Sequence, residues 1–498
     1  MPKLNGDILY LIFKELQYNK NAIFSCLMVN KTWCEMIIPI LWKDPWKYLK
    51  GKELKEPLFN VIISHLSDES RNNLKNQGIN ILTNVYQKPS FNYISFCKYL
   101  NLEILNELIS AINNLKNTDL FLSVRKEIIN LFINENTRIT HLYVPCQFDY
   151  QLHLVSGAKN CFSELEFLSC STYIKDDILF GLTEICKSIK ELELFIEKDN
   201  NNYEIVKLIE SSKKLFNVHL LTKYPENVII TSFCKILENS FIKHADTIQD
   251  FTITKEPITR ILSSFVNLYK LELGKFSFRT RSWKCLENLS LPFLQILKTG
   301  GVPVKVLTNL IKNTNGYLVE INISRIFHNE IDNEKIIQAI YQKCPNLKYL
   351  KLVVRNCNIL EFEKLLINCQ YLNGLYIILC NYKNFGTDAL FNWNLLFKVL
   401  VESSPTNLFR FKFHFIETPK LESLKLFLDN WKGKHPLLLQ TSQLADELSD
   451  YIIFDKTSIY FDLIEEYKIQ GIVKKHSHNN LMWQRFTFED FEWIQENI

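Results

Sequence analysis

A short apolar motif returns along most of this chain and limits what the chain can fold into. The motif places apolar residues at its first, fourth and sixth positions, with variable residues between them. Eleven copies begin at residues 139, 162, 189, 215, 248, 268, 294, 318, 347, 372 and 408, at spacings of 20 to 36 residues. One copy is too short to bury its own apolar face, so the copies must stack on their neighbours.

Each copy predicts a short strand, and the segments between copies predict helices. In residues 408–415 apolar and polar side chains alternate, as they do in a strand. In residues 334–343, Ile336, Ile337 and Ile340 share one face of a helix. Strand and helix alternating at this spacing are typical of leucine-rich repeats. We therefore predict an α/β fold, in which an N-terminal helical domain precedes a leucine-rich-repeat solenoid of horseshoe form.

A helical solenoid or an irregular α+β domain is the alternative interpretation of the same spacing. Strand segments rich in β-branched and aromatic residues, such as Leu352-Val353-Val354, argue against it.

The cysteines follow the repeat. Cys186, Cys344 and Cys369 each stand three residues before the first apolar position, and Cys170 and Cys380 stand three residues after the last, where leucine-rich repeats place Asn or Cys at a turn. The chain has 13 cysteines, an odd number, and none of them forms a CxxC pair. We predict buried, reduced thiols, with no disulfide framework, no metal site and no cofactor.

Three zones of the chain differ in their pattern. We assign residues 1–48 to an N-terminal domain, residues 49–135 to a helical connector, and residues 136–498 to the solenoid with an atypical C-terminal cap. In the cap, residues 419–431 and 458–473 predict helices, and residues 436–441 and 483–488 predict strands. The basic stretch at residues 474–478 predicts a solvated turn before the last strand.

Composition and motifs exclude several function classes. With 58 basic and 54 acidic side chains the net charge is only +4, which disfavours nucleic acid as a partner. No apolar stretch is long enough to span a bilayer, so we expect no membrane partner and a cytoplasmic or nuclear protein. The sequence contains no GxGxxG, GxxxxGK[ST], HExxH or GxSxG motif, and no spacing of Ser, His and carboxylate residues suggests catalysis. We therefore predict that the protein is not an enzyme.

Residues 4–42 predict compact amphipathic helices that are too short to bury much core alone. The segment from Leu4 to Leu16 resembles the opening of an F-box motif. Val29-Asn30-Lys31-Thr32-Trp33 resembles the Val-Cys-basic-x-Trp segment of that family, and Pro39-Ile40-Leu41-Trp42 resembles its closing Leu-Trp. F-box proteins that carry leucine-rich repeats are a familiar pairing.

The resemblance implies a substrate receptor of SCF-type ubiquitin ligases, with the repeats selecting the substrate. The F-box would dock on a Skp1-type adaptor, and through it on a cullin and a RING subunit, and the chain itself would perform no bond chemistry. The residues expected to carry the docking are Leu4, Ile8, Ile12, Phe13, Leu16, Leu27, Val29, Trp33 and Trp42. A scaffold that holds a partner through its repeats and never engages a ligase is the alternative.

The strand pattern also predicts which side chains line the concave face of the repeats, because they alternate with the buried apolar residues. The candidates for substrate binding are Glu164, Glu166, Glu191, Glu193, Asp250, Tyr349, Lys351, Tyr376, Arg410 and Lys412. The earlier strands therefore present carboxylates and the later ones present cations and tyrosines. We expect a partner segment of opposite polarity, with solvated strand charge as the alternative.

Overall fold

The computed structural model describes residues 4–49, 55–79, 89–111, 118–222, 231–274, 282–324, 329–379, 391–415, 418–444 and 453–481. The chain divides into two compact units, Met1–Thr247 and Ile248–Ile498. Among the described residues, no helix has both the length and the apolar character that a bilayer crossing requires.

The first unit begins with three helices, α1 (Gly6–Leu16), α2 (Lys20–Leu27) and α3 (Lys31–Trp42). An asparagine side chain caps each helix by accepting a hydrogen bond from a backbone N–H of its first turn. The capping residues are Asn5, Asn19 and Asn30. These caps let three separate helices start within a short segment.

The predicted connector contains helices and one strand. The elements are α4 (Lys55–Ser64), α5 (Asp68–Asn76), α6 (Tyr93–Phe96), β1 (Tyr99–Asn101), α7 (Leu102–Ser110) and α8 (Thr118–Phe132). The sequence does not predict β1, which is three residues long and precedes the first copy of the motif. This strand pairs in parallel with β2, so the repeat sheet of the first unit begins inside the connector.

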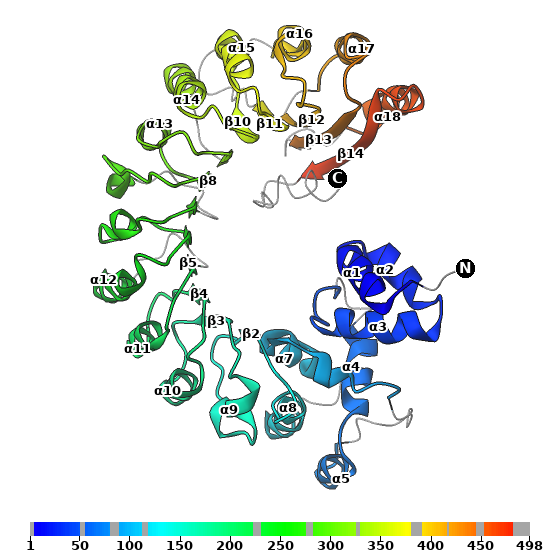
Figure 1. Ribbon diagram of the computed structural model, residues 1–498, viewed down its shortest axis with the longest axis vertical. Helices are drawn as coiled ribbons and strands as arrows, with labels where there is room; N and C mark the ends of the chain where they lie inside the picture. Colours follow the sequence, from blue (N-terminus) through cyan, green and yellow to red (C-terminus); the bar gives the residue numbers. More distant parts are fainter. Residues whose placement is uncertain are drawn as a thin grey trace. The chain divides into compact units, whose positions relative to one another are not determined.

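The rest of the first unit alternates strands and helices, as the motif predicts. The elements are β2 (His141–Tyr143), α9 (Ala158–Cys161), β3 (Phe167–Ser171), α10 (Asp176–Ile185), β4 (Glu191–Phe195), α11 (Ile205–Ser211), β5 (Asn217–Leu221) and α12 (Thr231–Ser240). Strands β1 to β5 pair in parallel in chain order. Helices α10 and α11 cover one face of this sheet, and the opposite face of β3 to β5 carries none of the described helices (Figure 1).

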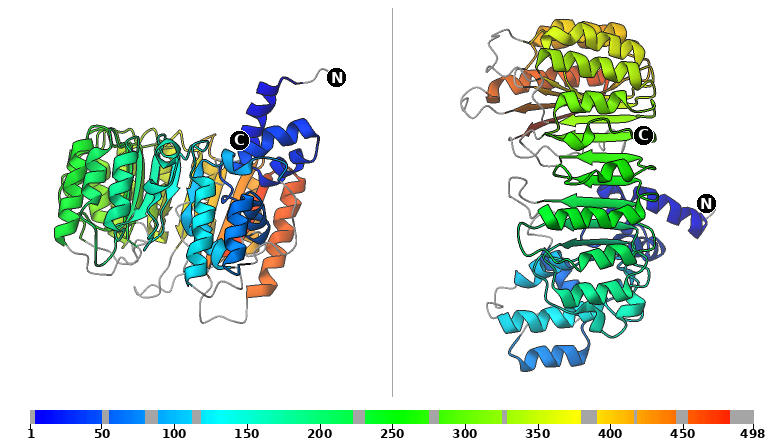
Figure 2. Two further views of the ribbon diagram at one scale, coloured as in Figure 1. Left: turned by 90° about the horizontal axis from the view of Figure 1, so that it is seen from below. Right: turned by 90° about the vertical axis from the view of Figure 1, so that its left-hand side faces the viewer.

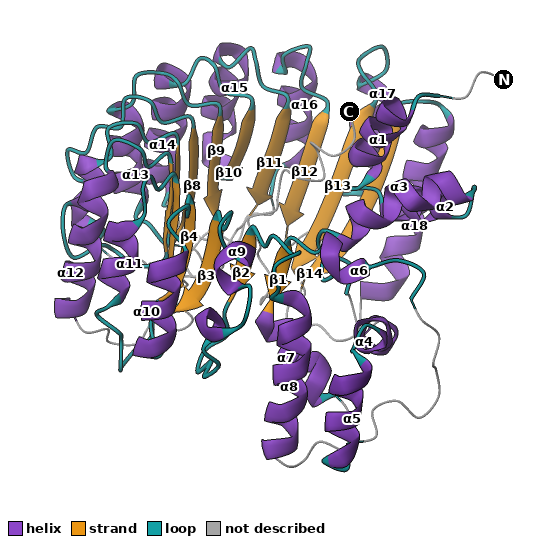
Figure 3. Cartoon of the chain, turned by 60° about the horizontal axis from the view of Figure 1, so that its bottom comes forward, coloured by secondary structure: helices purple, strands orange, loops and turns teal. Residues whose placement is uncertain are grey.

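The second unit repeats the pattern, with short 3-10 helices after β6 (Ile261–Ser264) and β7 (Lys284–Leu286) and α-helices after the later strands. Its strands are β6 (Asp250–Ile253), β7 (Lys270–Leu273), β8 (Ile296–Gly300), β9 (Glu320–Ser324), β10 (Tyr349–Val353), β11 (Gly374–Leu379), β12 (Arg410–Phe415), β13 (Leu437–Leu444) and β14 (Val473–Leu481). Its helices are α13 (Val304–Lys312), α14 (Glu330–Lys343), α15 (Ile359–Asn368), α16 (Trp393–Ser403), α17 (Leu421–Asn430) and α18 (Ile453–Ile469). All nine strands are parallel neighbours in chain order. Figures 2 and 3 show α13 to α16 side by side along one face of these strands.

In both units, a carbonyl directly before a strand accepts two hydrogen bonds from the next repeat, and this holds for β1 to β4 and β6 to β10. In the second unit the carbonyl oxygen of Gln249 accepts from the N–H groups of Tyr269 and Lys270, and the carbonyl oxygen of Tyr269 accepts from Gln295 and Ile296. The second apolar residue of the motif pairs in the sheet register with the same residue of the neighbouring strand, as Leu350 does with Leu375. The fold is therefore a strand–helix repeat solenoid of the leucine-rich-repeat type, as predicted.

One copy of the motif is read three residues too early from the sequence. The register pairs Leu142 with Leu168, so the true second position is Leu168 and the copy runs Leu165/Leu168/Cys170. The apolar spacing of the motif also occurs by chance at Phe162, Leu165 and Phe167. As a result, Glu164 and Glu166 precede β3 rather than alternating along it. Cys170 fills a buried strand position rather than a turn.

The other recurring cysteines end helices. Cys186, Cys344 and Cys369 are the residues that directly follow α10, α14 and α15, and each donates its N–H to the carbonyl four residues earlier. All three side chains are buried, and burial raises the pKa of the Cys186 and Cys369 thiols to about 12. The twelve cysteines that the structure describes are free, and Cys380 lies outside the described residues.

The C-terminal cap differs from its prediction at one place. Helices α17 and α18 and strand β13 match the expected elements, whereas the basic stretch at residues 474–478 forms part of β14 instead of a turn. The pairing of β14 with β13 shifts register at Lys474, and His476 packs against Phe461 of α18 at 5.6 Å between ring centres. The strand predicted at residues 483–488 lies outside the described residues.

Glycine at position 274 is required by a close approach between neighbouring repeats. Gly274 has φ +68°, and a Cβ placed there would lie 1.7 Å from the carbonyl oxygen of Gly300. We expect Gly274→Ala to lower the thermal midpoint markedly. Gly433→Ala is the matched control, because Gly433 has φ +86° with no atom within 4 Å of an added Cβ. The control should lose only the backbone term of about 1 to 2 kcal/mol, and equal losses in both variants would contradict the close approach.

Acidification should weaken the cap through His476. Burial, followed by the charges of His478 and Lys468, lowers the pKa of His476 to about 4, against about 6.5 in an unfolded chain. Between these values the unfolded chain binds a proton that the folded chain does not, so the free energy of unfolding falls as pH falls. Denaturation at pH 7 and pH 5 should show a larger loss for the wild type than for His476→Phe, which cannot titrate. Equal losses would show that His476 does not contribute.

Candidate functional site

The predicted docking residues divide into an exposed group and an inner group. An exposed apolar stripe runs along α1 at Ile8, Leu11 and Ile12, which share one helix face, and the exposed Leu4 lies just before the helix. Met28 and Val29, between α2 and α3, are 87% and 55% exposed. We call these six residues the α1 stripe. Leu11 and Met28 were not among the predicted docking residues.

The inner group holds the three helices together. Phe13 is fully buried with Leu9, Ile23 and Ile37, and Leu16, Leu27 and Trp33 pack against this cluster. The Phe13 and Trp33 rings meet edge to face at 5.1 Å. Trp42 instead packs on Tyr93 of the connector at 4.7 Å between ring centres. The structure therefore separates side chains available to a partner from side chains that support the fold, which the sequence alone does not.

The end of α3 is joined to the start of the repeat sheet by backbone hydrogen bonds. The carbonyl oxygen of Lys43 accepts from the N–H groups of Lys98 and Tyr99, at 2.9 and 3.1 Å. The Trp46 indole N–H donates to the carbonyl oxygen of Tyr99 at 2.6 Å, and the Trp46 ring packs on Phe132. These contacts bury Trp46 and attach the helical domain directly to β1.

An aromatic strip lies on the first unit's sheet, on the face opposite the buried leucines. Tyr99, His141 and Phe167 occupy paired positions on β1, β2 and β3. The His141 ring stacks between the other two, 3.9 Å from Tyr99 and 5.4 Å from Phe167. Tyr143 packs on Phe167 at 5.0 Å. All four side chains are partly exposed, so the strip is a surface feature.

In the sheet register, Tyr99, His141 and Phe167 form one row and Tyr143 belongs to a second row. Each row continues to a carboxylate on β4. Glu191 on β4 pairs with Phe167 in the sheet register, and Glu193 pairs with Ser169. Glu193 accepts a hydrogen bond from the Ser169 hydroxyl at 2.8 Å and lies 3.7 Å from His219. Glu166 forms an ion pair with Lys190 at 2.6 Å at the edge of the strip. The predicted acidic positions Glu191 and Glu193 thus lie together on this face.

Carboxylates near the strip act on Tyr143, and the histidine of the strip is neutral. Burial, followed by the charges of Asp44 and Glu193, raises the pKa of Tyr143 to about 12. Burial and then Lys43 lower the pKa of His141, so its ring is neutral at pH 7. A neutral imidazole stacks on its neighbours as a third aromatic ring.

The predicted basic positions of the second unit also meet, but they are buried. Tyr376 lies between the ammonium groups of Lys351 and Lys412, which stand 4.4 and 4.6 Å from the centre of its ring. The three residues are paired neighbours on β10, β11 and β12. Lys351 and Tyr376 are each 1% exposed, and Lys412 is 8% exposed. We call these residues the cation–tyrosine stack.

Two other predicted binding residues, Tyr349 and Arg410, lie on β10 and β12, the strands on either side of Tyr376. Tyr349 is half-buried against Tyr376, Val353 and Ile378. Arg410 is buried, with its guanidinium 4.6 Å from the centre of the Phe409 ring. The sequence correctly brings these residue types to one face, but it does not reveal that they are covered.

The remaining candidate, Asp250, is engaged by the neighbouring strand. Its carboxylate forms an ion pair with Lys270 at 2.7 Å, and the register places the two residues side by side on β6 and β7. Lys298 and Glu320 form a similar pair at 3.1 Å between β8 and β9. At both of these places in the second unit, opposite charges on adjacent strands form ion pairs.

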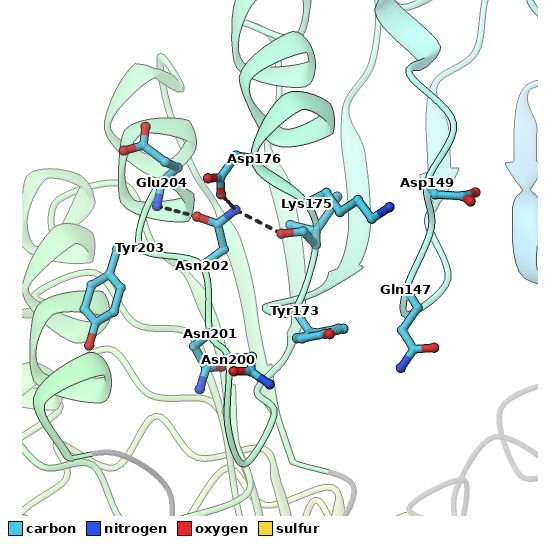
Figure 4. A pocket seen from close by; sticks show the side chains of 11 residues that line it. Gln147, Asp149, Tyr173, Lys175, Asp176, Asn200, Asn201, Asn202, Tyr203 and Glu204 are labelled. Carbon is cyan, nitrogen blue, oxygen red and sulfur yellow. Dashed lines mark hydrogen bonds between the residues drawn. The ribbon is translucent and has the colours of Figure 1, made fainter.

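A polar groove of about 780 Å³ lies among the loops that follow β2, β3 and β4 (Figure 4). Asn202 donates to the carbonyl oxygen of Ile174 and to the Asp176 carboxylate, at 2.9 and 2.7 Å, and it accepts from the Glu204 N–H. Asn201 donates to the carbonyl oxygen of Glu197 at 3.1 Å. The asparagines of the groove therefore hold the loops in place. Among the described residues, no group of three or more His, Cys, Asp or Glu side chains could hold a metal ion.

Replacing Tyr376 should destabilise the second unit beyond the loss of one ring. Two buried ammonium groups lie against its π face, and the loss of a cation–π contact from a buried charge is costly. We expect Tyr376→Leu to lower the free energy of unfolding by about 2 to 4 kcal/mol. Tyr371→Leu in the same repeat is the control and should cost less than about 1 kcal/mol, because Tyr371 is 59% exposed. Denaturant titration would reject the stack if the two variants lost the same amount.

Comparison with known proteins gives only distant likenesses. No protein-family model and no curated protein matches the chain. Among solved structures, the leucine-rich repeat-containing protein LegL7 from Legionella pneumophila is similar at 12% identity and a TM-score of 0.31, over 68% of this chain and 91% of that one. A chain of the yeast Rad7 and Elc1 complex is similar at 12% identity and a TM-score of 0.36, over 82% of this chain and 97% of that one. At this distance neither likeness carries an argument about function.

Proposed function

We propose that this chain is the substrate-recognition subunit of an SCF-type ubiquitin ligase. In this proposal helices α1 to α3 dock on a Skp1-type adaptor, which connects the chain to a cullin and a RING subunit. The repeat sheet holds the substrate protein, and the chain makes and breaks no bond itself. The F-box resemblance of residues 4–42 motivates the proposal, and the α1 stripe is the observation that carries it.

The stripe supports docking because the helical domain is already packed without it. Its core is filled by Phe13 and the residues around it, and Ile8, Leu11 and Ile12 lie outside that core. Nine large apolar side chains are exposed within residues 4–29, a density that in soluble proteins marks an interaction surface. The exposed set is Leu4, Ile8, Tyr10, Leu11, Ile12, Tyr18, Phe24, Met28 and Val29.

The attachment of the helical domain suits a receptor. The Lys43 carbonyl and the Trp46 indole fix α3 to β1, and the Tyr48 hydroxyl donates to the carbonyl oxygen of Gln17 at 2.6 Å. Trp42 adds its contact with Tyr93. A ligase receptor must present its substrate at a defined position, and such a junction limits the motion between adaptor and sheet.

Adaptor capture tests the proposal. The full-length wild type should co-purify stoichiometrically with a Skp1-type adaptor. Ile12→Asp, which places a charge on a side chain that is 41% exposed, should abolish capture without unfolding the domain. Leu154→Asp is the matched control and should retain capture, because Leu154 is 70% exposed but lies outside the helical domain.

The outcomes separate the candidate functions. Loss of capture in both variants would point to a general effect of added charge, and thermal melting of each variant would identify unfolding. No capture by a folded wild type would reject the adaptor role. The non-ligase scaffold, which uses the same repeats, would then be the remaining interpretation.

A further inference from the structure

We infer that the aromatic strip and the carboxylates beside it bind an arginine-bearing segment of a protein partner. The binding surface consists of Tyr99, His141, Tyr143, Phe167 and Glu191, with Glu193 at its end. This inference rests on the proposed function and names the partner class that the first unit's sheet selects.

The order of the rings and carboxylates is the first argument. Three stacked rings occupy one register row on β1, β2 and β3, and the next residue in that row is Glu191. A planar guanidinium can lie flat on a ring and present its N–H groups to a carboxylate beside it. The Phe167 and Glu191 pair provides both groups on neighbouring strands.

The size of the strip is the second argument. Neighbouring strands are about 4.8 Å apart, so the row from Tyr99 to Glu191 extends about 14 Å. An extended segment rises about 3.3 Å per residue, so about four residues fit along the row, and two of their side chains can face it. The strip is therefore long enough for a short linear segment rather than a single side chain.

The charges around the strip define the partner's sign. Glu191 makes no ion pair with any residue that the structure describes, and Glu193 and Asp44 raise the pKa of Tyr143 after burial itself. The nearby cations include Lys43, whose ammonium stands 5.7 Å from the centre of the Tyr99 ring, Lys98, which directly precedes β1, and Lys190, which is paired with Glu166. The carboxylates disfavour phosphates, so a nucleic acid or a phosphopeptide fits poorly.

Arginine suits the strip better than lysine. The ammonium of lysine is compact and strongly hydrated, whereas the guanidinium is flat and more weakly hydrated. Phe167 is the last ring of the stack and lies beside Glu191, so a flat cation placed there gains both ring stacking and the cation–π attraction. His141 is neutral at pH 7 and does not repel it.

A labelled peptide measures this directly. The probe is a fluorescein-labelled dodecapeptide of four Gly-Ser-Arg repeats, compared with peptides that carry Gln or Lys in place of Arg. Fluorescence anisotropy with the full-length chain should give a Kd at least tenfold lower for the Arg peptide than for the Gln peptide, with the Lys peptide between them. An acidic Gly-Ser-Asp peptide should not bind.

Substitutions then locate the site. Glu191→Gln should weaken Arg-peptide binding roughly fivefold to tenfold, and Phe167→Leu roughly threefold to fivefold. Glu184→Gln removes the same charge from an exposed position on α10 and should leave the Kd unchanged. Equal binding of Arg and Gln peptides overturns the inference. It is also overturned if Glu191→Gln and Phe167→Leu, shown to be folded by thermal melting, bind like the wild type, or if Glu184→Gln is weakened as much as Glu191→Gln.

Adaptor capture by the same preparations separates this inference from the proposed function. Glu191→Gln should capture the adaptor as the wild type does, because Glu191 lies on β4 and not on the α1 stripe. Peptide binding that depends on Glu191, with no adaptor capture by the wild type, would leave the arginine site standing and reject the ligase role.

Discussion

The backbone carbonyl that accepts two hydrogen bonds from the next repeat is the interaction on which the rest of this structure depends. In the first unit these carbonyls receive N–H groups from the next repeat at 2.8 to 3.2 Å, and all but the first belong to the residue directly before a strand. The acceptors run in order through Lys43, Lys98, Thr140, Glu166 and Lys190. Because the first of them, Lys43, directly follows α3, the helical domain takes the place of a repeat in this ladder. Its attachment to the sheet therefore uses the same geometry as every later repeat.

A fixed ladder has consequences for side chains. Residues at equivalent positions face the same way and lie one strand spacing apart, so like residues stack and opposite charges pair. Tyr99, His141 and Phe167 become a ring stack, and Asp250 and Lys270 become an ion pair. A row takes one residue from each of several repeats. The binding properties of a face therefore cannot be recognised in the sequence of any single repeat.

This geometry also explains which features the sequence predicts. The motif predicts the strands and their buried positions because core burial imposes the same residue types on every repeat. It fails at β3, where Phe162, Leu165 and Phe167 imitate the pattern and the true third position is Cys170. The motif does not predict β1, which carries the first ring of the aromatic strip, because a strand of three residues is too short to show a recognisable pattern.

Burial is the other quantity that the sequence does not provide. On α1 both the inner residues Leu9 and Phe13 and the outer residues Ile8 and Ile12 are apolar, and only the packing of α2 and α3 decides which are covered. The cation–tyrosine stack shows the opposite case. Its charged residues predict an exposed surface, whereas the structure buries them. In both cases the deciding contacts come from elements that are distant in the sequence.

The two surfaces proposed to bind partners belong to the same unit and are joined by the same ladder. The α1 stripe and the aromatic strip are separated by α3, the Lys43 carbonyl and β1, without an unstructured linker between α3 and the ladder. Trp46 stiffens this connection through its bond to Tyr99, which is itself the first ring of the strip. A partner held on the strip is thus held by residues whose backbone is bonded to the end of the adaptor-docking helices. In a receptor, that coupling sets the position of a bound segment by hydrogen-bond geometry rather than by the length of a linker.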